Sequence, residues 1–249
     1  NSNETRAEGG TVGDNATYGY VNSFDSDGFS VTKGSDSTSY TNGGSTNYVA
    51  WNWYAGGSTA TNNDGSRTAQ VRANTTAGFS IVTSTSGGSS SGTYDSFGHG
   101  LGVAPDIIIF KNRDIVDNWS IYNSNFSTAY SKILQFNTID ETTSTNHWGT
   151  ANPTSTTFSV NQGAVFTGAD QNFIAYCFSE VAGFSKFGKY TGNNNANGAF
   201  VYLGFRPALV IIKRLEAGYS WYMLDNKRDP INPMHENLYA NTDIATSLK

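Results

Sequence analysis

The chain has 249 residues and a mass of 26.8 kDa, with 37% hydrophobic, 14% aromatic and 14% charged residues. Good helix formers are scarce, whereas β-branched and aromatic residues alternate with Gly, Asn and Ser, which favours strands. The net charge of −5 and the lack of a Lys/Arg block argue against a nucleic-acid partner. No apolar run approaches the roughly 20 residues of a membrane helix, so we expect no membrane insertion. The single cysteine, Cys177, excludes an intrachain disulfide and is expected to be a buried thiol.

Short apolar runs bounded by Gly, Asn, Ser or Pro predict β-strands. In chain order these runs are 48–53, 79–82, 107–110, 119–122, 133–136, 173–178, 200–203, 209–212 and 221–224. The runs at 107–110 and 209–212 are apolar on both faces and are expected to be central strands, with Lys111 and Lys213 reaching water after them. Short connections predict antiparallel pairing, and hence an all-β fold of β-sandwich or jelly-roll type. A short helical turn is expected only at 232–238.

The sequence repeats itself in one order along the chain. The segment 102–111 aligns with 204–213, and the same spacing carries Trp119 onto Trp221. Upstream, the aligned pairs of segments are 29–31 with 158–160, 48–53 with 173–178, and 77–80 with 182–185. We therefore predict a tandem duplication, with a first β-repeat at 1–150 and a second at 151–249. The two repeats form either separate sandwiches or one pseudo-symmetric unit.

The two ends of the chain carry a weaker match. Residues 1–5 resemble both 137–142 and 241–246, so the chain begins and ends at the same point of the repeat. We therefore expect it to be a segment of a longer protein that carries further related modules.

Residues that could carry chemistry are scattered. The three histidines lie far apart without a neighbour at ligand spacing, which argues against a zinc site. Asp25 and Asp27 form a truncated calcium-loop pattern, for which a plain turn is the favoured interpretation. Spacing singles out no pair of carboxylates of the kind that a glycosidase needs. We therefore predict no catalytic residues, no metal and no cofactor, although a site shared between subunits would be invisible in one sequence.

Aromatic side chains are the remaining candidates for binding. They can stack on sugar rings while neighbouring Asn, Asp and Ser side chains bind the hydroxyl groups. The predicted glycan-stacking residues are Trp51, Trp53, Tyr54 and Trp148. Trp148 has no counterpart in the second copy and is expected to be exposed. Trp119 and Trp221 recur in both copies and are expected to pack in the interior.

Seven motifs together resemble a known family. They are 23–29, 48–53, 98–106, 176–178, 182–188, 205–207 and 224–228. In these motifs the chain resembles a repeated β-rich domain of unknown function found in structural proteins of tailed bacteriophages, notably marine and cyanobacterial ones. The resemblance covers nearly the whole chain and implies a virion protein, such as a tail fibre, a capsid fibre or a capsid decoration. The family brings no established catalytic residues.

These observations predict a non-enzymatic bacteriophage structural protein located in the virion, on the particle surface or in a tail appendage. The resemblance implies other virion proteins as partners, and such proteins assemble as homo-oligomers, often trimers. Host attachment through a surface glycan is a further expected role. Two alternatives remain, a carbohydrate-recognition module of a secreted or surface protein and a polysaccharide-degrading tailspike. Exposed aromatics beside amides would favour the first, and converging carboxylates at a subunit boundary would favour the second.

Overall fold

The structure is a computed structural model that describes residues 17–36, 41–139, 143–144, 146–216 and 218–242. The chain divides into two compact units, one that ends at Asn52 and a larger one that contains Trp53 and the residues after it. The predicted match that involves residues 1–5 lies outside the described residues. Strands make up most of the regular secondary structure in the described part of the chain.

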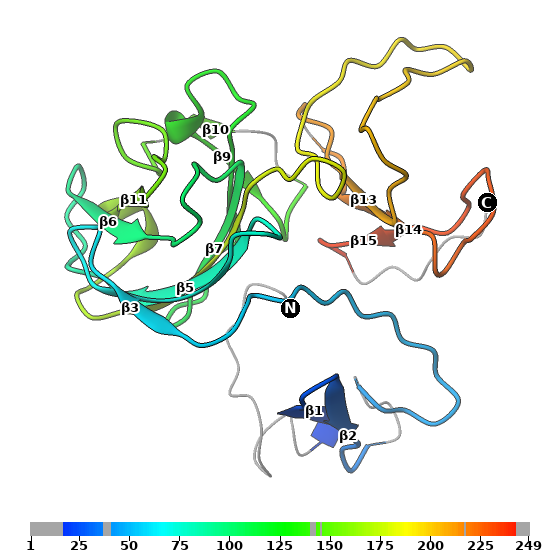
Figure 1. Ribbon diagram of the computed structural model, residues 1–249, viewed down its shortest axis with the longest axis horizontal. Helices are drawn as coiled ribbons and strands as arrows, with labels where there is room; N and C mark the ends of the chain where they lie inside the picture. Colours follow the sequence, from blue (N-terminus) through cyan, green and yellow to red (C-terminus); the bar gives the residue numbers. More distant parts are fainter. Residues whose placement is uncertain (1–16, 37–40, 140–142, 145, 217, 243–249) are drawn as a thin grey trace. The chain divides into compact units, whose positions relative to one another are not determined.

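The larger unit is built on an eight-stranded sheet of order β10-β9-β8-β7-β12-β5-β4-β3 (Figure 1). Its strands are β3 (Ala60–Asn62), β4 (Ala69–Asn74), β5 (Phe79–Thr85), β7 (Ile107–Asn112), β8 (Ser120–Asn123), β9 (Lys132–Gln135), β10 (Thr143–Ser144) and β12 (Asn172–Phe178). Neighbouring strands in this sheet pair antiparallel, as predicted.

Strand β12 lies in the middle of this sheet, between β5 and β7. Cys177 on β12 stands opposite Ser80 on β5 and opposite Ile108 on β7. The central strand therefore comes from the segment predicted as the second repeat, while both of its neighbours come from the first. The division at residue 150 stays a prediction, but one sheet draws strands from both sides of it.

A second layer covers one face of the eight-stranded sheet. It consists of β6 (Tyr94–Gly98) paired antiparallel with β11 (Thr157–Asn161), where Phe97 stands opposite Phe158. The Phe97 ring lies 5.8 Å from the Phe158 ring and 4.6 Å from that of Phe173 on β12. The two layers enclose one apolar core, which confirms the all-β, sandwich-type prediction. Two short helical turns, η1 (Ala129–Ser131) and α2 (Gln162–Val165), are part of the same unit.

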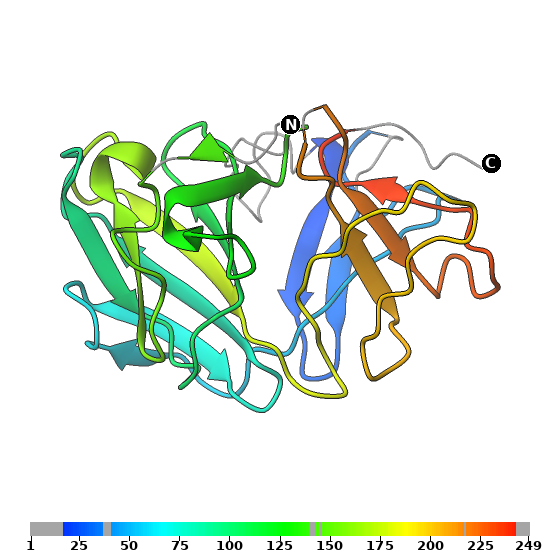
Figure 2. The same ribbon diagram turned by 90° about the horizontal axis from the view of Figure 1, so that it is seen from above.

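A three-stranded sheet follows in the larger unit, formed by β13 (Leu209–Ile212), β14 (Tyr222–Asp225) and β15 (Leu238–Tyr239). Figure 2 shows β13 and β14 side by side in orange. The register repeats that of β7 and β8 with every residue number raised by 102, so that Ile107 opposite Asn123 becomes Leu209 opposite Asp225. This identity of register supports the repeat at β7–β9 and β13–β15, whereas the complete duplication stays a prediction.

Hydrogen bonds at the strand ends repeat as well. The backbone N–H of Trp119 donates to Oδ1 of Asn137 at 2.8 Å, and that of Trp221 donates to Oδ1 of Asn241 at 2.9 Å. In each case the Asn side chain accepts a hydrogen bond from a backbone N–H that lies just before a strand. The hydrogen bonds between the strands supply no partner for that N–H. The same side chain therefore holds the same turn in both sheets.

Lys111 does not reach water as the sequence suggested. Its side chain is buried, and Nζ donates to the backbone oxygens of Asn112 and Ile115. Burial lowers the pKa of its ammonium group. The long side chain thus turns back to satisfy carbonyl groups at the end of β7.

Four sequence predictions about single segments are wrong. Residues 48–53 and 200–203 lie outside the strands that the described part of the chain forms. Residues 232–238 form bends and extended chain instead of a helical turn. Strand β13 is an edge strand, although its run is as apolar as that of the central β7.

The smaller unit holds one β-hairpin, β1 (Tyr20–Phe24) and β2 (Phe29–Thr32). Its turn closes with a hydrogen bond from the N–H of Asp25 to the oxygen of Gly28 at 2.9 Å. The Asp25 carboxylate accepts hydrogen bonds from Ser30 and Ser23, which lower its pKa. This geometry supports the interpretation of the segment as a turn.

Replacement of Gly78 by alanine should destabilise the larger unit by about 2 kcal/mol or more. Gly78 has a φ of +64°, and a Cβ there would lie 2.4 Å from the backbone oxygen of Ser179. L-residues pay roughly 1–2 kcal/mol for this backbone region, and the clash adds to that cost. Urea denaturation checks the prediction, with Gly168→Ala as the control because that Cβ would meet nothing within 4 Å. Equal midpoints for the two variants would contradict it.

Candidate binding surface

Trp148 is not the exposed aromatic that the sequence suggested. Its side chain is fully buried, and Nε1 donates to the backbone oxygen of Lys132 at 3.0 Å. Its ring packs edge-on against Phe110 and Tyr122, with centroids 6.4 and 5.9 Å away. A buried ring has no face free for a sugar, so Trp148 is a core residue and not a stacking platform.

The other predicted stacking residues lie nearer the surface. Trp53 is 44% exposed, and its ring packs against Phe79 and Phe178 at 6.5 and 5.9 Å. Tyr54 is 71% exposed. Trp51 is half-buried and belongs to the smaller unit. Trp53 and Tyr54 therefore remain accessible, while the predicted set as a whole is not one platform.

Of the two repeated tryptophans, Trp221 is buried as expected, whereas Trp119 is only half-buried. Trp221 is buried against the outer face of β8 and β9, in a cluster with Ile121 and Leu134, and its Nε1 donates to the oxygen of Gln135 at 2.9 Å. Trp119 is half-buried and stacks on Tyr176 at 6.4 Å. Both tryptophans serve packing more than ligand binding.

Two interior groups have strongly shifted pKa values. Burial raises the pKa of the Cys177 thiol to about 12, which confirms the expected buried cysteine. Burial lowers the pKa of His147 to about 4, and its Nε2 has no hydrogen-bond partner. His99 is also fully buried, and burial lowers its pKa too. These groups lie inside the fold, where they affect stability and have no access to a substrate.

Two carboxylates to which the sequence analysis gave no role accept hydrogen bonds that stabilise turns. Asp106 accepts hydrogen bonds from the hydroxyl of Ser124 and the N–H of Glu180, both at 2.8 Å. Asp114 accepts two hydrogen bonds from Asn172, at 2.5 and 3.0 Å. Among the described residues, no group of three or more His, Cys, Asp or Glu side chains gathers as metal ligands.

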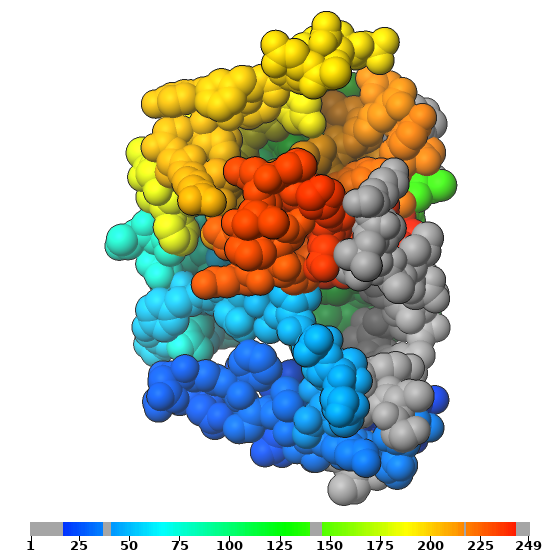
Figure 3. Space-filling model, turned by 90° about the vertical axis from the view of Figure 1, so that its right-hand side faces the viewer, coloured from blue at the N-terminus to red at the C-terminus, as the bar shows by residue number. Residues whose placement is uncertain are grey.

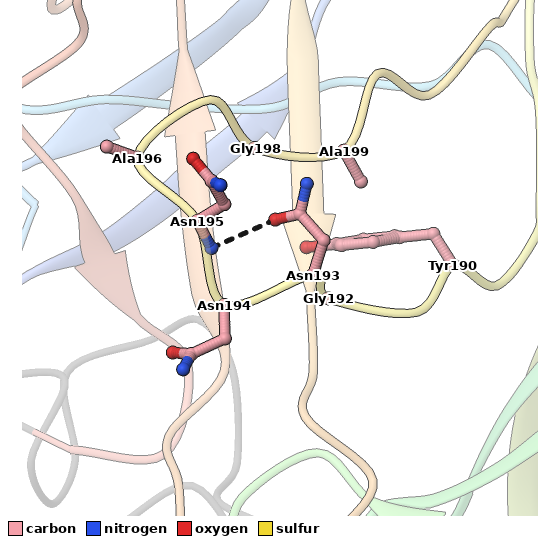
Figure 4. A pocket seen from close by; sticks show the side chains of 8 residues that line it. All are labelled: Tyr190, Gly192, Asn193, Asn194, Asn195, Ala196, Gly198 and Ala199. Atoms are coloured by element: carbon pink, nitrogen blue, oxygen red, sulfur yellow. Dashed lines mark hydrogen bonds between the residues drawn. The ribbon is translucent and has the colours of Figure 1, made fainter.

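A polar pocket lies in the long loop that precedes β13. Figure 4 shows it, with a volume of about 550 Å³, lined by Tyr190, Gly192, Asn193, Asn194, Asn195, Ala196, Gly198 and Ala199. Sequence reasoning missed this site, although the run Gly-Asn-Asn-Asn-Ala-Asn-Gly at 192–198 signals a loop dense in amide groups.

Amide side chains shape this loop from within. Oδ1 of Asn193 accepts a hydrogen bond from the N–H of Asn195 at 3.1 Å, and its Nδ2 donates to the oxygen of Asn197 at 2.9 Å. Oδ1 of Asn195 in turn accepts from the N–H of Asn197 at 2.9 Å. Asn194 adopts a left-handed φ of 51°, and its amide points away from this network in Figure 4. The loop is thus held by its own Asx bonds while some amide groups face outward.

Aromatic rings accompany the amides on this loop. Tyr190 lines the pocket and is 53% exposed, while Phe200 and Tyr202 are 89% and 78% exposed. In Figure 3 the yellow atoms of this part of the chain lie at the surface of the face shown. Exposed aromatics next to amides are the combination that carbohydrate sites use.

A smaller and more apolar pocket of about 170 Å³ lies against the three-stranded sheet. Its lining is Arg206, Pro207, Ala208, Val210, Leu224, Asn226, Asp229, Pro230, Asn232 and Met234. Asp225 nearby is buried and paired with Nε of Arg228 at 2.7 Å; burial would raise its pKa, but hydrogen bonds from Arg228 lower it overall. The lining of this pocket is therefore mainly apolar, and the Asp225–Arg228 pair is not part of it.

The fold defines an all-β protein with several antiparallel sheets and a polar, aromatic-bearing loop. Within the described residues, no helix has the length and apolar character that crossing a membrane would require. A family model described as a domain of unknown function, DUF7483, matches residues 1–248, and the chain belongs to this family. Neither the curated proteins nor the solved structures contained a match.

Proposed function

We propose that this DUF7483 protein is a non-enzymatic structural and attachment module that binds glycans through its 190–199 loop. The observation that carries the proposal is the open pocket of about 550 Å³, whose lining combines three Asn residues with the half-exposed ring of Tyr190. The hollow is wide open to solvent, so a ligand would lie on its surface and would not be enclosed.

The chemistry of the pocket suits a polyhydroxylated ligand. Amide groups donate and accept hydrogen bonds at once, as sugar hydroxyls do, and a tyrosine ring can pack on the CH face of a pyranose. A sugar bound to so open a loop would keep much of its surface in water. We therefore expect each chain to bind glycan weakly through this pocket.

The virion setting is part of the same proposal. It is supported by the motif resemblance to structural proteins of tailed bacteriophages and by a β-rich fold without disulfides. A non-enzymatic role is supported by the carboxylates of Asp106 and Asp114, which are committed to turn hydrogen bonds. We infer a place on the particle surface or in a tail appendage, with host attachment as its task.

Tyr190→Ala should weaken glycan binding by roughly tenfold, because a stacked aromatic contributes about 1 kcal/mol or more beyond its buried area. The measurement is binding of the whole protein to an array of bacterial surface polysaccharides, followed by titration of the best one. Tyr202→Ala is the matched control, since Tyr202 is an exposed tyrosine on the same stretch of chain that does not line the pocket. Equal losses for both variants, or no binding to any polysaccharide, would refute the glycan role.

A further inference from the structure

The loop at 190–199 contains an asparagine that is followed by a glycine. The sequence has two such Asn-Gly pairs, at 42–43 and at 197–198. A backbone nitrogen can attack the amide carbon of the preceding Asn side chain when the two groups meet in the reacting geometry. Glycine has no Cβ and adopts more backbone conformations than other residues, so an Asn-Gly pair reaches this geometry most readily.

Both reacting groups of the pair at 197–198 are free in the structure. All residues of 191–200 are exposed. Within the described part of the chain, neither the side-chain amide of Asn197 nor the backbone N–H of Gly198 has a hydrogen-bond partner. Gly198 lies on the open loop of Figure 4, and a Cβ built on it would meet no atom within 4 Å. Attack on Asn197 therefore breaks no hydrogen bond and displaces no packed side chain.

The Asn-Gly pair at 42–43 is held by hydrogen bonding. The backbone N–H of Gly43 donates to the hydroxyl of Tyr48 at 2.8 Å. The nitrogen that would attack the Asn42 side chain is therefore already committed, and its reaction would break this bond. The chain thus contains an engaged pair that serves as an internal comparison for the free one.

The neighbouring asparagines of the loop are also less suited to the reaction. Asn193, Asn194 and Asn195 each precede a residue that has a Cβ, which hinders approach of the backbone nitrogen. The side chains of Asn193 and Asn195 are further restrained by hydrogen bonds to backbone groups of the loop. Asn197 therefore stands apart from the asparagines around it.

We propose that Asn197 and Gly198 form a site of spontaneous modification, at which Asn197 is converted through a cyclic imide to aspartate and isoaspartate. A base from the solvent takes the proton of the Gly198 nitrogen, which forms a bond to Cγ of Asn197. The bond from Cγ to the side-chain nitrogen breaks, and this nitrogen takes up a proton from the solvent and leaves as ammonia. Water then opens the imide at either carbonyl group. The whole change consumes a water molecule, releases an ammonia molecule and involves no oxidation or reduction.

The conversion falls where the hydrogen bonds of the loop meet. The backbone N–H of Asn197 donates to Oδ1 of Asn195, and its backbone oxygen accepts from Nδ2 of Asn193, both at 2.9 Å. In isoaspartate the chain runs through Cγ, so that backbone oxygen becomes part of a free carboxylate. The residues that line the pocket carry no charged side chain. The modification therefore places a negative charge beside an uncharged pocket and alters the loop that shapes it.

Ageing of the whole protein in a mildly alkaline buffer tests the site without any glycan. Peptide mass spectrometry and labelling by an isoaspartate methyltransferase measure the conversion of each asparagine. We expect Asn197 to convert about tenfold faster than Asn42 or more, and Gly198→Ala to slow the conversion of Asn197 by about the same factor. The added Cβ meets no neighbouring atom, so this variant should fold normally. Conversion of Asn197 that is no faster than that of Asn42, or that is equally fast in Gly198→Ala, would overturn the proposal.

A second measurement follows the effect on the pocket, which rests on the proposed function. Glycan binding by the aged unmodified protein should fall in proportion to its converted fraction, whereas aged Gly198→Ala should bind as its own fresh sample does. Equal relative losses in the two proteins would overturn the effect on the pocket. Absence of glycan binding in the fresh protein would refute the proposed function alone, because the conversion is measured without a glycan.

Discussion

Replacement of Trp148 by alanine is expected to lower the free energy of unfolding by about 3–5 kcal/mol, the usual cost of removing a large buried aromatic side chain. The ring is fully buried against Phe110 and Tyr122, and its Nε1 satisfies the backbone oxygen of Lys132. The variant leaves a cavity and an unpaired carbonyl group. Urea denaturation followed by circular dichroism measures the loss.

A matched control separates packing from surface effects. Tyr54→Ala removes an aromatic side chain that is 71% exposed, so its unfolding free energy should change by no more than about 0.5 kcal/mol. Glycan binding by the same two variants compares the predicted sugar-stacking roles of Trp148 and Tyr54. Only Tyr54 is accessible to a ligand. A Trp148→Ala variant as stable as the unmodified protein would contradict the buried placement of Trp148.

Acid is expected to destabilise the fold through His147. Its pKa falls from 6.5 to about 4 because the imidazole is buried. The folded state therefore prefers the neutral ring, and the unfolded state binds the proton first as the pH falls. This stabilisation is complete above about pH 6.5 and is lost between pH 6.5 and 4, by about 3 kcal/mol in all, since one pKa unit is worth about 1.4 kcal/mol.

Denaturation curves recorded from pH 7.5 to pH 4 measure this dependence. His147→Gln should flatten the curve of stability against pH in that window, and His99, whose pKa burial also lowers, should account for part of the remaining slope. Val160→Ala is the control, because it removes buried apolar volume without a titrating group and should lower stability by a similar amount at every pH. An unchanged slope in His147→Gln would contradict the prediction.

Strand content was accessible to sequence reasoning because it depends on local pattern. The runs at 79–82, 107–110, 173–178 and 209–212 all lie within strands, since short apolar segments between turn residues have few other ways to bury their side chains. The repeat carried further information, because β13 and β14 keep the register of β7 and β8. Antiparallel pairing followed from the short connections.

The candidate site was largely beyond the reach of the sequence. Trp148 stands among polar residues and suggested exposure, yet the surrounding strands close over it. The Asn-rich run at 192–198 was visible, but the shape of its loop depends on hydrogen bonds between Asn side chains and backbone groups of the same run. The order of residue types along the chain does not determine which side chains line a common pocket.

By itself, the sequence determined that this protein is all-β and antiparallel, because strand periodicity and turn chemistry are local properties, while the full duplication that it predicts stays a prediction. Only the tertiary structure decided which strands are central and which aromatics are buried. Residues 48–53 and β12 have similar patterns, but only β12 lies between two partners. A strand forms where neighbours supply hydrogen bonds and cover its faces, and those neighbours come from distant parts of the chain.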